Sequence, residues 1–140
     1  MIFEKEDIKS VTLLSFEEYR DNKEIIPAVN SWWWLRTPGS FKKNAAYVFI
    51  DAEAHTEGYK VGSTAGVRPL IIVDAAKAKE IKVGEKVMIG KYAATVLDDK
   101  SCLIDECVTR RKFDDVTNDY EVSELKSFLE SPSFMELIFD

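Results

Sequence analysis

The stretch Asn30–Ser40, NSWWWLRTPGS, places three tryptophans in a row before a Leu-Arg-Thr-Pro-Gly segment. Indole is the largest apolar side chain and carries an N–H that needs a partner when buried, so these rings are either packed in a core or used by a ligand. If the segment is extended, its side chains alternate between two faces. Trp32, Trp34 and Arg36 would then share one face, and Trp33 and Leu35 the other. One of the two faces would join the core, and the other would form a platform.

Two interpretations of this stretch differ in what covers the rings. In the first, aromatic faces beside a guanidinium bind a sugar, a base or a cationic group through stacking and cation–π attraction. In the second, Trp33, Trp34 and Leu35 fill the core. The guanidinium groups of Arg36 and Arg68 then hold loops together by hydrogen bonds to carbonyls or a carboxylate. We favour the second interpretation.

The whole chain has the composition of one folded domain. Its 140 residues are 46% hydrophobic and 31% charged, which is too apolar for a disordered chain and enough for one core. Acidic residues outnumber basic ones by 25 to 19, and the formal net charge is −6. Direct nucleic-acid binding is therefore not expected, because it depends on neutralising phosphates. The basic run Thr109–Lys112 has acidic neighbours, and we expect it to be a solvated turn.

Signals for a membrane, a disulfide or a metal are lacking. No run of about 18 apolar residues is present, and the first ten residues do not resemble a secretory signal, so we expect a cytoplasmic protein without membrane attachment. Cys102 and Cys107 are five residues apart, which on one strand would point them to opposite faces as reduced, mostly buried thiols. With one histidine and no cysteine pair at ligand spacing, we predict no metal and no cofactor.

The apolar pattern predicts an α+β domain with a mostly antiparallel sheet and two or three short helices. Ser15 and Glu18 form a capping box, which predicts a helix from Phe16 to about Asn22. Glycines at 58, 62 and 66 indicate a hairpin-like return followed by a loop. Strands are expected at 11–14, at 45–53 and at 67–74, and a three-stranded meander is expected within 85–108. The strand at 67–74 is the most apolar, so it should lie in the centre of the sheet.

Helical turns are expected at both ends of the chain and in one connection. One turn should fall within Phe3–Lys9, and another in the charged segment Ala75–Gly84. Near the end, four apolar residues recur at helical spacing, and Pro132 follows as the first residue of a second helix. The four residues are Val122, Leu125, Phe128 and Leu129.

Two motifs resemble those of an uncharacterised bacterial domain family common in gut Firmicutes and their mobile elements. The family pattern W-W-L-R-S-P-G is similar to Trp33–Gly39, where Thr37 replaces the serine, and G-V-R-P-A-L is similar to the segment that starts at Gly66. A more distant likeness of the G-V-R ending links the domain to the formylglycine-generating-enzyme and C-type-lectin-like folds, which implies a lectin-like architecture. The resemblance implies a structural role for Trp33, Trp34, Leu35, Pro38, Gly39, Gly66 and Pro69.

The matching segments stand in inverted order relative to that family. Residues 84–140 resemble the hairpins and helix with which the relatives begin, whereas residues 1–74 hold the W-W-L-R and G-V-R-P half, and residues 75–83 connect the two. The resemblance therefore implies one circularly permuted domain over 1–140. Such a rearrangement costs little when the original ends are close, so Met1 and Asp140 should lie near each other. The chain is a monomer if its halves pair internally, and a domain-swapped dimer if they pair between chains.

The candidates for a ligand or partner surface are Trp32, Arg36, His55 and Arg68. Trp32 is the tryptophan that we expect to be exposed. His55 is the only imidazole, and the nearby Asp51, Glu53 and Glu57 would orient it as a base or join it on a metal; we favour a solvated loop histidine. No hydroxyl or thiol has a second histidine as its base, and no phosphate-binding glycine loop occurs, so we predict no catalytic residue.

These features predict a non-enzymatic binding or protein-interaction module of a bacterium, phage or other mobile element. Its partner would be a protein or a small ligand of unknown identity. One alternative is a small acidic inhibitor of a basic, nucleic-acid-handling host or defence protein, because complementary charge steers association. The other, which we favour least, is a hydrolase or transferase that uses His55.

Overall fold

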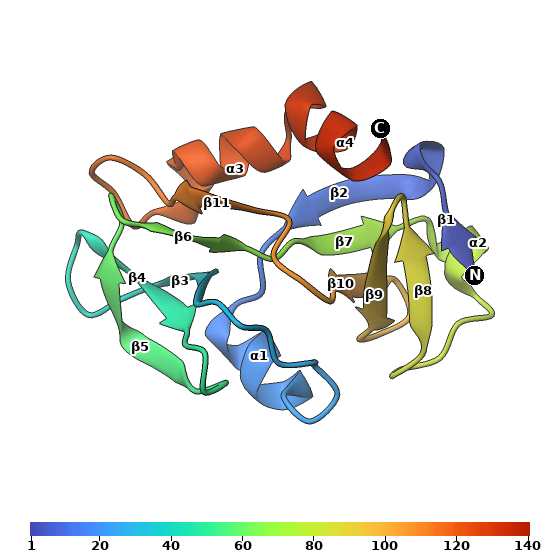
Figure 1. Cartoon of the computed structure of the whole chain (residues 1–140), viewed down its shortest axis with the longest axis horizontal. Helices are drawn as coiled ribbons and strands as arrows, with labels where there is room; N and C mark the ends of the chain where they lie inside the picture. Colours follow the sequence, from blue (N-terminus) through green and yellow to red (C-terminus); the bar gives the residue numbers. More distant parts are fainter.

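Two β-sheets organise the chain in a computed structural model that describes all residues 1–140 (Figure 1). Neighbouring strands are antiparallel except for one parallel pair in each sheet. The six-stranded sheet runs β1 (Ile2–Phe3), β8 (Lys86–Ile89), β9 (Tyr92–Val96), β10 (Ser101–Ile104), β7 (Leu70–Val73) and β2 (Ile8–Thr12). The five-stranded sheet runs β11 (Thr109–Lys112), β6 (Thr64–Val67), β3 (Trp33–Pro38), β4 (Asn44–Val48) and β5 (Ala54–Lys60).

Four short α-helices pack on the sheets, which confirms the α+β fold with one helix more than expected. They are α1 (Phe16–Asn22), α2 (Ala75–Ala78), α3 (Glu124–Leu129) and α4 (Pro132–Phe139), with 3₁₀ turns at Lys5–Asp7 and Tyr120–Val122. No helix is of a length and hydropathy that would cross a bilayer. Figure 1 shows α3 and α4 along one side of the molecule and α1 on the opposite side.

Local capping determines where the helices begin. Ser15 Oγ accepts a hydrogen bond from Glu18 N at 3.1 Å, and Glu18 Oε1 accepts one from Ser15 N at 2.8 Å, so α1 occupies its predicted residues. Ser131 caps α4, with Pro132 as its first residue. The meander of β8, β9 and β10 and the single turn of α2 are also confirmed.

Several sequence-based predictions were wrong because pairing partners lie far along the chain. The segment with Gly58, Gly62 and Gly66, which was expected to form a hairpin-like return and a loop, contains the strands β5 and β6, and these are not neighbours in the sheet. The run Thr109–Lys112 is not a turn but the edge strand β11, which pairs with β6. The strand expected at 45–53 ends at Val48. Val122 is exposed and belongs to a 3₁₀ turn, so it does not join the apolar face of α3.

Pro69 divides the expected strand at 67–74 between the two sheets. Val67 ends β6 in the five-stranded sheet, and Leu70 begins β7 in the six-stranded sheet. Proline has no N–H to donate to a ladder, so a change of sheet at this point leaves no backbone donor unpaired. Strand β7 lies between β10 and β2, as expected of an interior strand.

The alternation of β3 distributes its large side chains between two cores. Trp34 belongs to the larger cluster of 23 buried residues. Trp33 and Leu35 belong to a second cluster of nine, which packs against α1 through Tyr19. All three side chains are essentially inaccessible, so the prediction that they fill the core is confirmed.

The two cysteines are free, but they do not share a strand. Cys102 lies in β10, and burial raises the pKa of its thiol to about 12. Cys107 lies in the connection from β10 to β11, where burial also raises its pKa. A Cβ on Gly66 would collide with the Cys107 sulfur, which explains why a glycine occupies this position in β6.

Both ends of the chain lie against the same hairpin, β8–β9. Met88 N donates to Met1 O at 3.0 Å, and Lys91 N donates to Ile138 O at 3.1 Å. Figure 1 accordingly shows the N- and C-termini at the same end of the molecule. The two halves, 1–74 and 84–140, pair with each other inside one chain through β1–β8, β7–β10 and β6–β11.

Candidate functional site

A continuous series of aromatic rings leads from the core to the surface of the five-stranded sheet. Phe113 and Trp34 are fully buried, with ring centroids 5.7 Å apart. Trp34 contacts the half-buried Trp32 at 5.2 Å, and Trp32 contacts Tyr47 at 5.2 Å and Tyr59 at 5.4 Å, all edge-to-face. Trp34 Nε1 donates to Arg111 O at 2.9 Å, so the buried indole N–H is satisfied.

The outer end of this series is an open pocket of about 230 Å³. We call it the aromatic pocket, and it is lined by Trp32, Tyr47, Phe49 and Tyr59. Tyr59 is 49% exposed and Phe49 is 41% exposed, although both are large apolar side chains. The lining comes from the residue before β3, from β4, from the turn after β4 and from β5, so antiparallel pairing assembles the pocket.

Two carboxylates lie near Tyr47 in the aromatic pocket. Burial raises the pKa of Tyr47, and the carboxylates of Glu57 and Asp51 raise it further. A hydrogen bond from its own backbone N–H, followed by one from His55, holds the pKa of Glu57 below its usual value. Glu57 therefore keeps its negative charge at neutral pH, next to rings that carry no formal charge.

His55 lies on β5, directly opposite Tyr47 in the register of β4 and β5. Its ring stacks on Tyr47 with centroids 4.9 Å apart and an interplanar angle of 5°. Its Nδ1 is 3.1 Å from Glu57 Oε1, whereas its Nε2 is buried without a hydrogen-bond partner. The prediction of a solvated loop histidine was wrong, because cross-strand pairing places the ring against Tyr47.

The other two carboxylates near His55 in sequence have different partners. Glu53 pairs with Lys23 Nζ at 3.0 Å, and Asp51 Oδ1 accepts from Glu53 N at 2.9 Å. No group of three or more His, Cys, Asp and Glu side chains is placed to hold a metal ion. The described contacts of His55 thus support the shape of the aromatic pocket.

The two candidate arginines lie away from the pocket and hold loops together. Arg36 Nη1 donates to Leu13 O and, at 2.6 Å, to Glu18 Oε1. Arg68 Nε donates to Ile104 O at 2.8 Å. Burial lowers the pKa of Arg68 to about 10, and with 1% of its surface exposed this residue is no part of a ligand surface. The structural interpretation of both arginines is confirmed.

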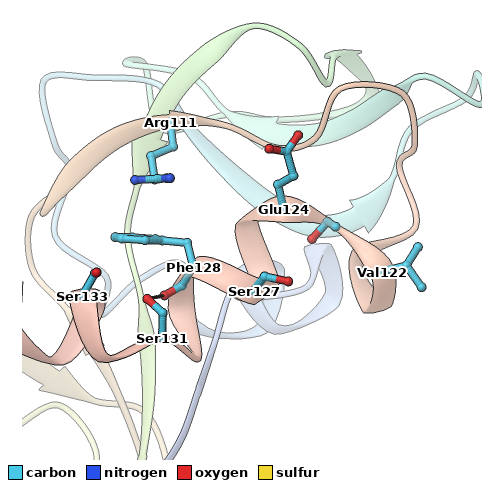
Figure 2. A pocket seen from close by; sticks show the side chains of 8 residues that line it. Arg111, Val122, Glu124, Ser127, Phe128, Ser131 and Ser133 are labelled. Carbon is cyan, nitrogen blue, oxygen red and sulfur yellow. Dashed lines mark hydrogen bonds between the residues drawn. The ribbon is translucent and has the colours of Figure 1, made fainter.

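A second, larger hollow of about 460 Å³ lies between β11 and the C-terminal helices (Figure 2). Figure 2 shows the Arg111 guanidinium above the ring of Phe128, and its carbon lies 4.0 Å from the ring centroid. Ser127, Ser131 and Ser133 contribute hydroxyls around this pair. We call this surface the Arg111 hollow. The sequence did not indicate it, because Thr109–Lys112 was expected to be a turn.

Sequence reasoning also missed Tyr47, Phe49 and Tyr59 as site residues. Their alternation with smaller residues in β4 and β5 was a signal for strands, but the pairing that brings them to Trp32 is a property of the folded sheet. Of the four predicted surface residues, the structure brings Trp32 and His55 together around Tyr47. It places Arg36 and Arg68 elsewhere.

Residues 1–75 match the family described as a domain of unknown function, DUF6273. The chain belongs to this family. The matched residues span β1 to β7, so the whole aromatic pocket lies inside the DUF6273 part and the Arg111 hollow lies outside it. No curated protein and no solved structure matches the chain. The expectation of an uncharacterised domain is confirmed.

Proposed function

We propose that this DUF6273 domain is a non-catalytic binding module whose ligand occupies the aromatic pocket. The observation that carries the proposal is the exposure of Tyr59 and Phe49 at the end of a ring series anchored in the core. Leaving large rings in water forgoes the stabilisation that their burial would supply. Clustered exposed apolar side chains are typical of interaction sites.

The packing around the pocket supports binding with little rearrangement. Trp32 is held by edge contacts to Trp34, Tyr47 and Tyr59 at 5.2 to 5.4 Å. Ordering a flexible side chain on binding costs about 0.5–1.5 kcal/mol. Rings that are already ordered avoid most of this cost, which favours recognition by a rigid surface.

A catalytic function has less support from the same contacts. His55 Nδ1 faces Glu57, and its Nε2 is covered, so neither nitrogen is presented to a substrate. Burial raises the pKa of both cysteine thiols, which disfavours the nucleophilic thiolate. We therefore retain the hydrolase or transferase hypothesis only as the weakest alternative.

The permuted order and the lectin-like kinship also remain proposals. Contact of both termini with the β8–β9 hairpin supports the permutation, because it satisfies the geometric requirement for joining the old ends. A domain-swapped dimer would use the same strand pairs between two chains, so the choice between monomer and swapped dimer stays a prediction. A cytoplasmic module of a bacterium, phage or mobile element is our preferred setting.

A fragment screen by ¹H–¹⁵N NMR tests the binding function. Compounds that carry planar, apolar or charged groups should shift the Trp32 indole N–H signal and the Tyr59 amide. Trp32→Ala should abolish the shift of the Tyr59 amide, and Val122→Ala, at a 70% exposed apolar side chain outside the pocket, should leave both shifts unchanged. A screen whose hits all bind elsewhere would contradict the proposal.

A further inference from the structure

We infer that the aromatic pocket accepts a lysine or arginine side chain that projects from a basic partner protein. This inference rests on the proposed binding function and specifies its ligand. Three features support it: the exposed rings of Phe49 and Tyr59, the carboxylates of Glu57 and Asp51, which act on Tyr47, and the charge of the whole chain. One face of Tyr47 is covered by His55, so the other rings supply the open aromatic surface. A cation over an aromatic face is attracted by the negative face of the ring's quadrupole.

Three aromatic rings elsewhere in the molecule have a cationic partner. Arg111 lies 4.0 Å from the Phe128 centroid, Arg68 lies 5.0 Å from that of Trp33, and Arg20 lies 5.7 Å from that of Phe16. None of the four pocket rings has an arginine or lysine of the chain over it. The pocket therefore offers the same interaction that the chain uses internally, with the cation missing.

Charge complementarity favours a cation over other ligands. Glu57 and Asp51 are the charged groups that act on the Tyr47 hydroxyl, and both are acidic. A carboxylate or phosphate ligand would be repelled by them, whereas an ammonium or guanidinium would be attracted. The net charge of −6 extends this preference to the approach of a basic protein.

The lining also suits the stem of a basic side chain. The four lining residues are all aromatic, and their polar groups are two phenol hydroxyls and one indole N–H. Lysine and arginine can lay their methylene stems on apolar surface while the charged head reaches water or a carboxylate. A sugar would instead need several hydrogen-bonding groups for its hydroxyls, and the lining has no amide or carboxylate side chain for that task.

Short capped peptides test the inference. The probes are Ac-Gly-Gly-X-Gly-Gly-NH₂ with X as lysine, arginine, norleucine or glutamate, titrated at low salt and followed by ¹H–¹⁵N NMR. The lysine and arginine peptides should shift the Trp32 indole signal and bind about fivefold more tightly than the norleucine peptide. Added salt should reduce this difference, and the glutamate peptide should bind most weakly.

Two pairs of variants separate a cation site from a merely apolar one. Glu57→Gln should reduce binding of the lysine peptide about threefold and leave norleucine binding unchanged, whereas the matched Glu136→Gln on α4 should change neither. Trp32→Ala should remove binding of all the peptides. Tyr59→Ala, at a 49% exposed side chain, should weaken binding of the lysine peptide about tenfold, and it tests the pocket in case the loss of Trp32 disturbs folding.

The outcomes distinguish this inference from the function on which it rests. Equal affinity for the lysine and norleucine peptides would overturn the cation inference and leave a general apolar binding site. Shifts confined to other surfaces for every peptide would also overturn it. If the fragment screen likewise left the pocket signals unmoved, the proposed binding function would fail as well.

Discussion

The aromatic pocket and the Arg111 hollow differ in whether a cation of the same chain lies over their aromatic rings. In the hollow, the face of Phe128 is covered by Arg111 of the same chain (Figure 2). In the pocket, Trp32, Tyr47, Phe49 and Tyr59 surround an open space with no cation of the chain above them. The first surface is complete within the molecule, and we propose that a ligand completes the second.

If volume alone were used to choose a candidate binding site, the Arg111 hollow would rank above the aromatic pocket. The Arg111 hollow is twice as large, at about 460 Å³ against about 230 Å³. However, its aromatic face is already occupied by Arg111, and the Glu124 carboxylate at its edge pairs with Lys112 Nζ at 3.7 Å. We therefore propose the smaller aromatic pocket as the binding site, because none of its rings has an arginine or lysine of the chain over it.

Trp34 joins the two regions, and its removal should have the largest effect. It packs on Trp32 on the pocket side, and its Nε1 donates to the carbonyl of Arg111 on the other side. Trp34→Ala should lower the free energy of unfolding by about 3–5 kcal/mol, as is typical of a buried tryptophan. Urea denaturation followed by circular dichroism would measure this loss. A loss under about 1 kcal/mol would mean that the ring series is not anchored in the core.

Tyr59→Ala should separate binding from stability. Because the side chain is half exposed, its removal should change the free energy of unfolding by less than about 1 kcal/mol. It should nevertheless weaken binding of the lysine peptide about tenfold, equivalent to about 1.4 kcal/mol. Calorimetric titration beside urea denaturation would test both values. A large loss of stability with unchanged binding would reverse the roles assigned to the two regions.

Arg111→Met should have the complementary effect. It removes the charge above Phe128 and keeps much of the apolar stem, so we expect a loss of about 0.5–1 kcal/mol in stability. Binding at the aromatic pocket should not change. Arg110→Met is the matched control, because Arg110 bonds Ser31 and the Thr64 carbonyl rather than a ring. Tighter ligand binding in Arg111→Met would show that the two surfaces are coupled.

A permuted chain should show the smallest effect. The pocket is built from residues 1–74 and the Arg111 hollow from residues 84–140. If the proposed permutation is correct, restoring the original order would exchange these two halves. Joining Asp140 to Met1 through a short Gly-Ser linker and opening the chain between Lys79 and Glu80 should alter stability by about 1 kcal/mol or less. Urea denaturation and peptide titration would test this. A permuted chain that fails to fold would argue against the inferred rearrangement.

Part of the structure could be predicted from interactions between residues that are close in sequence. The Ser15 and Glu18 cap, Pro132 at the start of α4 and the β8–β10 meander depend on neighbours a few residues apart. The burial of Trp33 and Trp34 followed from their size. These features require no knowledge of which distant segments meet.

The residues that form the aromatic pocket could not be predicted in this way, because they come from segments whose pairing the sequence did not reveal. Trp32 was expected to be exposed, yet the three rings that complete its pocket come from β4, the following turn and β5. His55 was expected in a loop, but the pairing of β4 with β5 places its ring in a stack on Tyr47. Strand alternation predicts which side chains share a face of one strand, but not which strands become neighbours or in what register.

The sequence by itself therefore determined the fold class, the helix caps and the core role of the W-W-L-R segment, because size, alternation and capping act over short distances. Only the tertiary structure decided that Arg68 is buried, that Thr109–Lys112 is a strand, and that four rings meet around an open pocket. The physical reason is that long-range strand pairing selects neighbours by the packing of the whole sheet, which no single segment encodes.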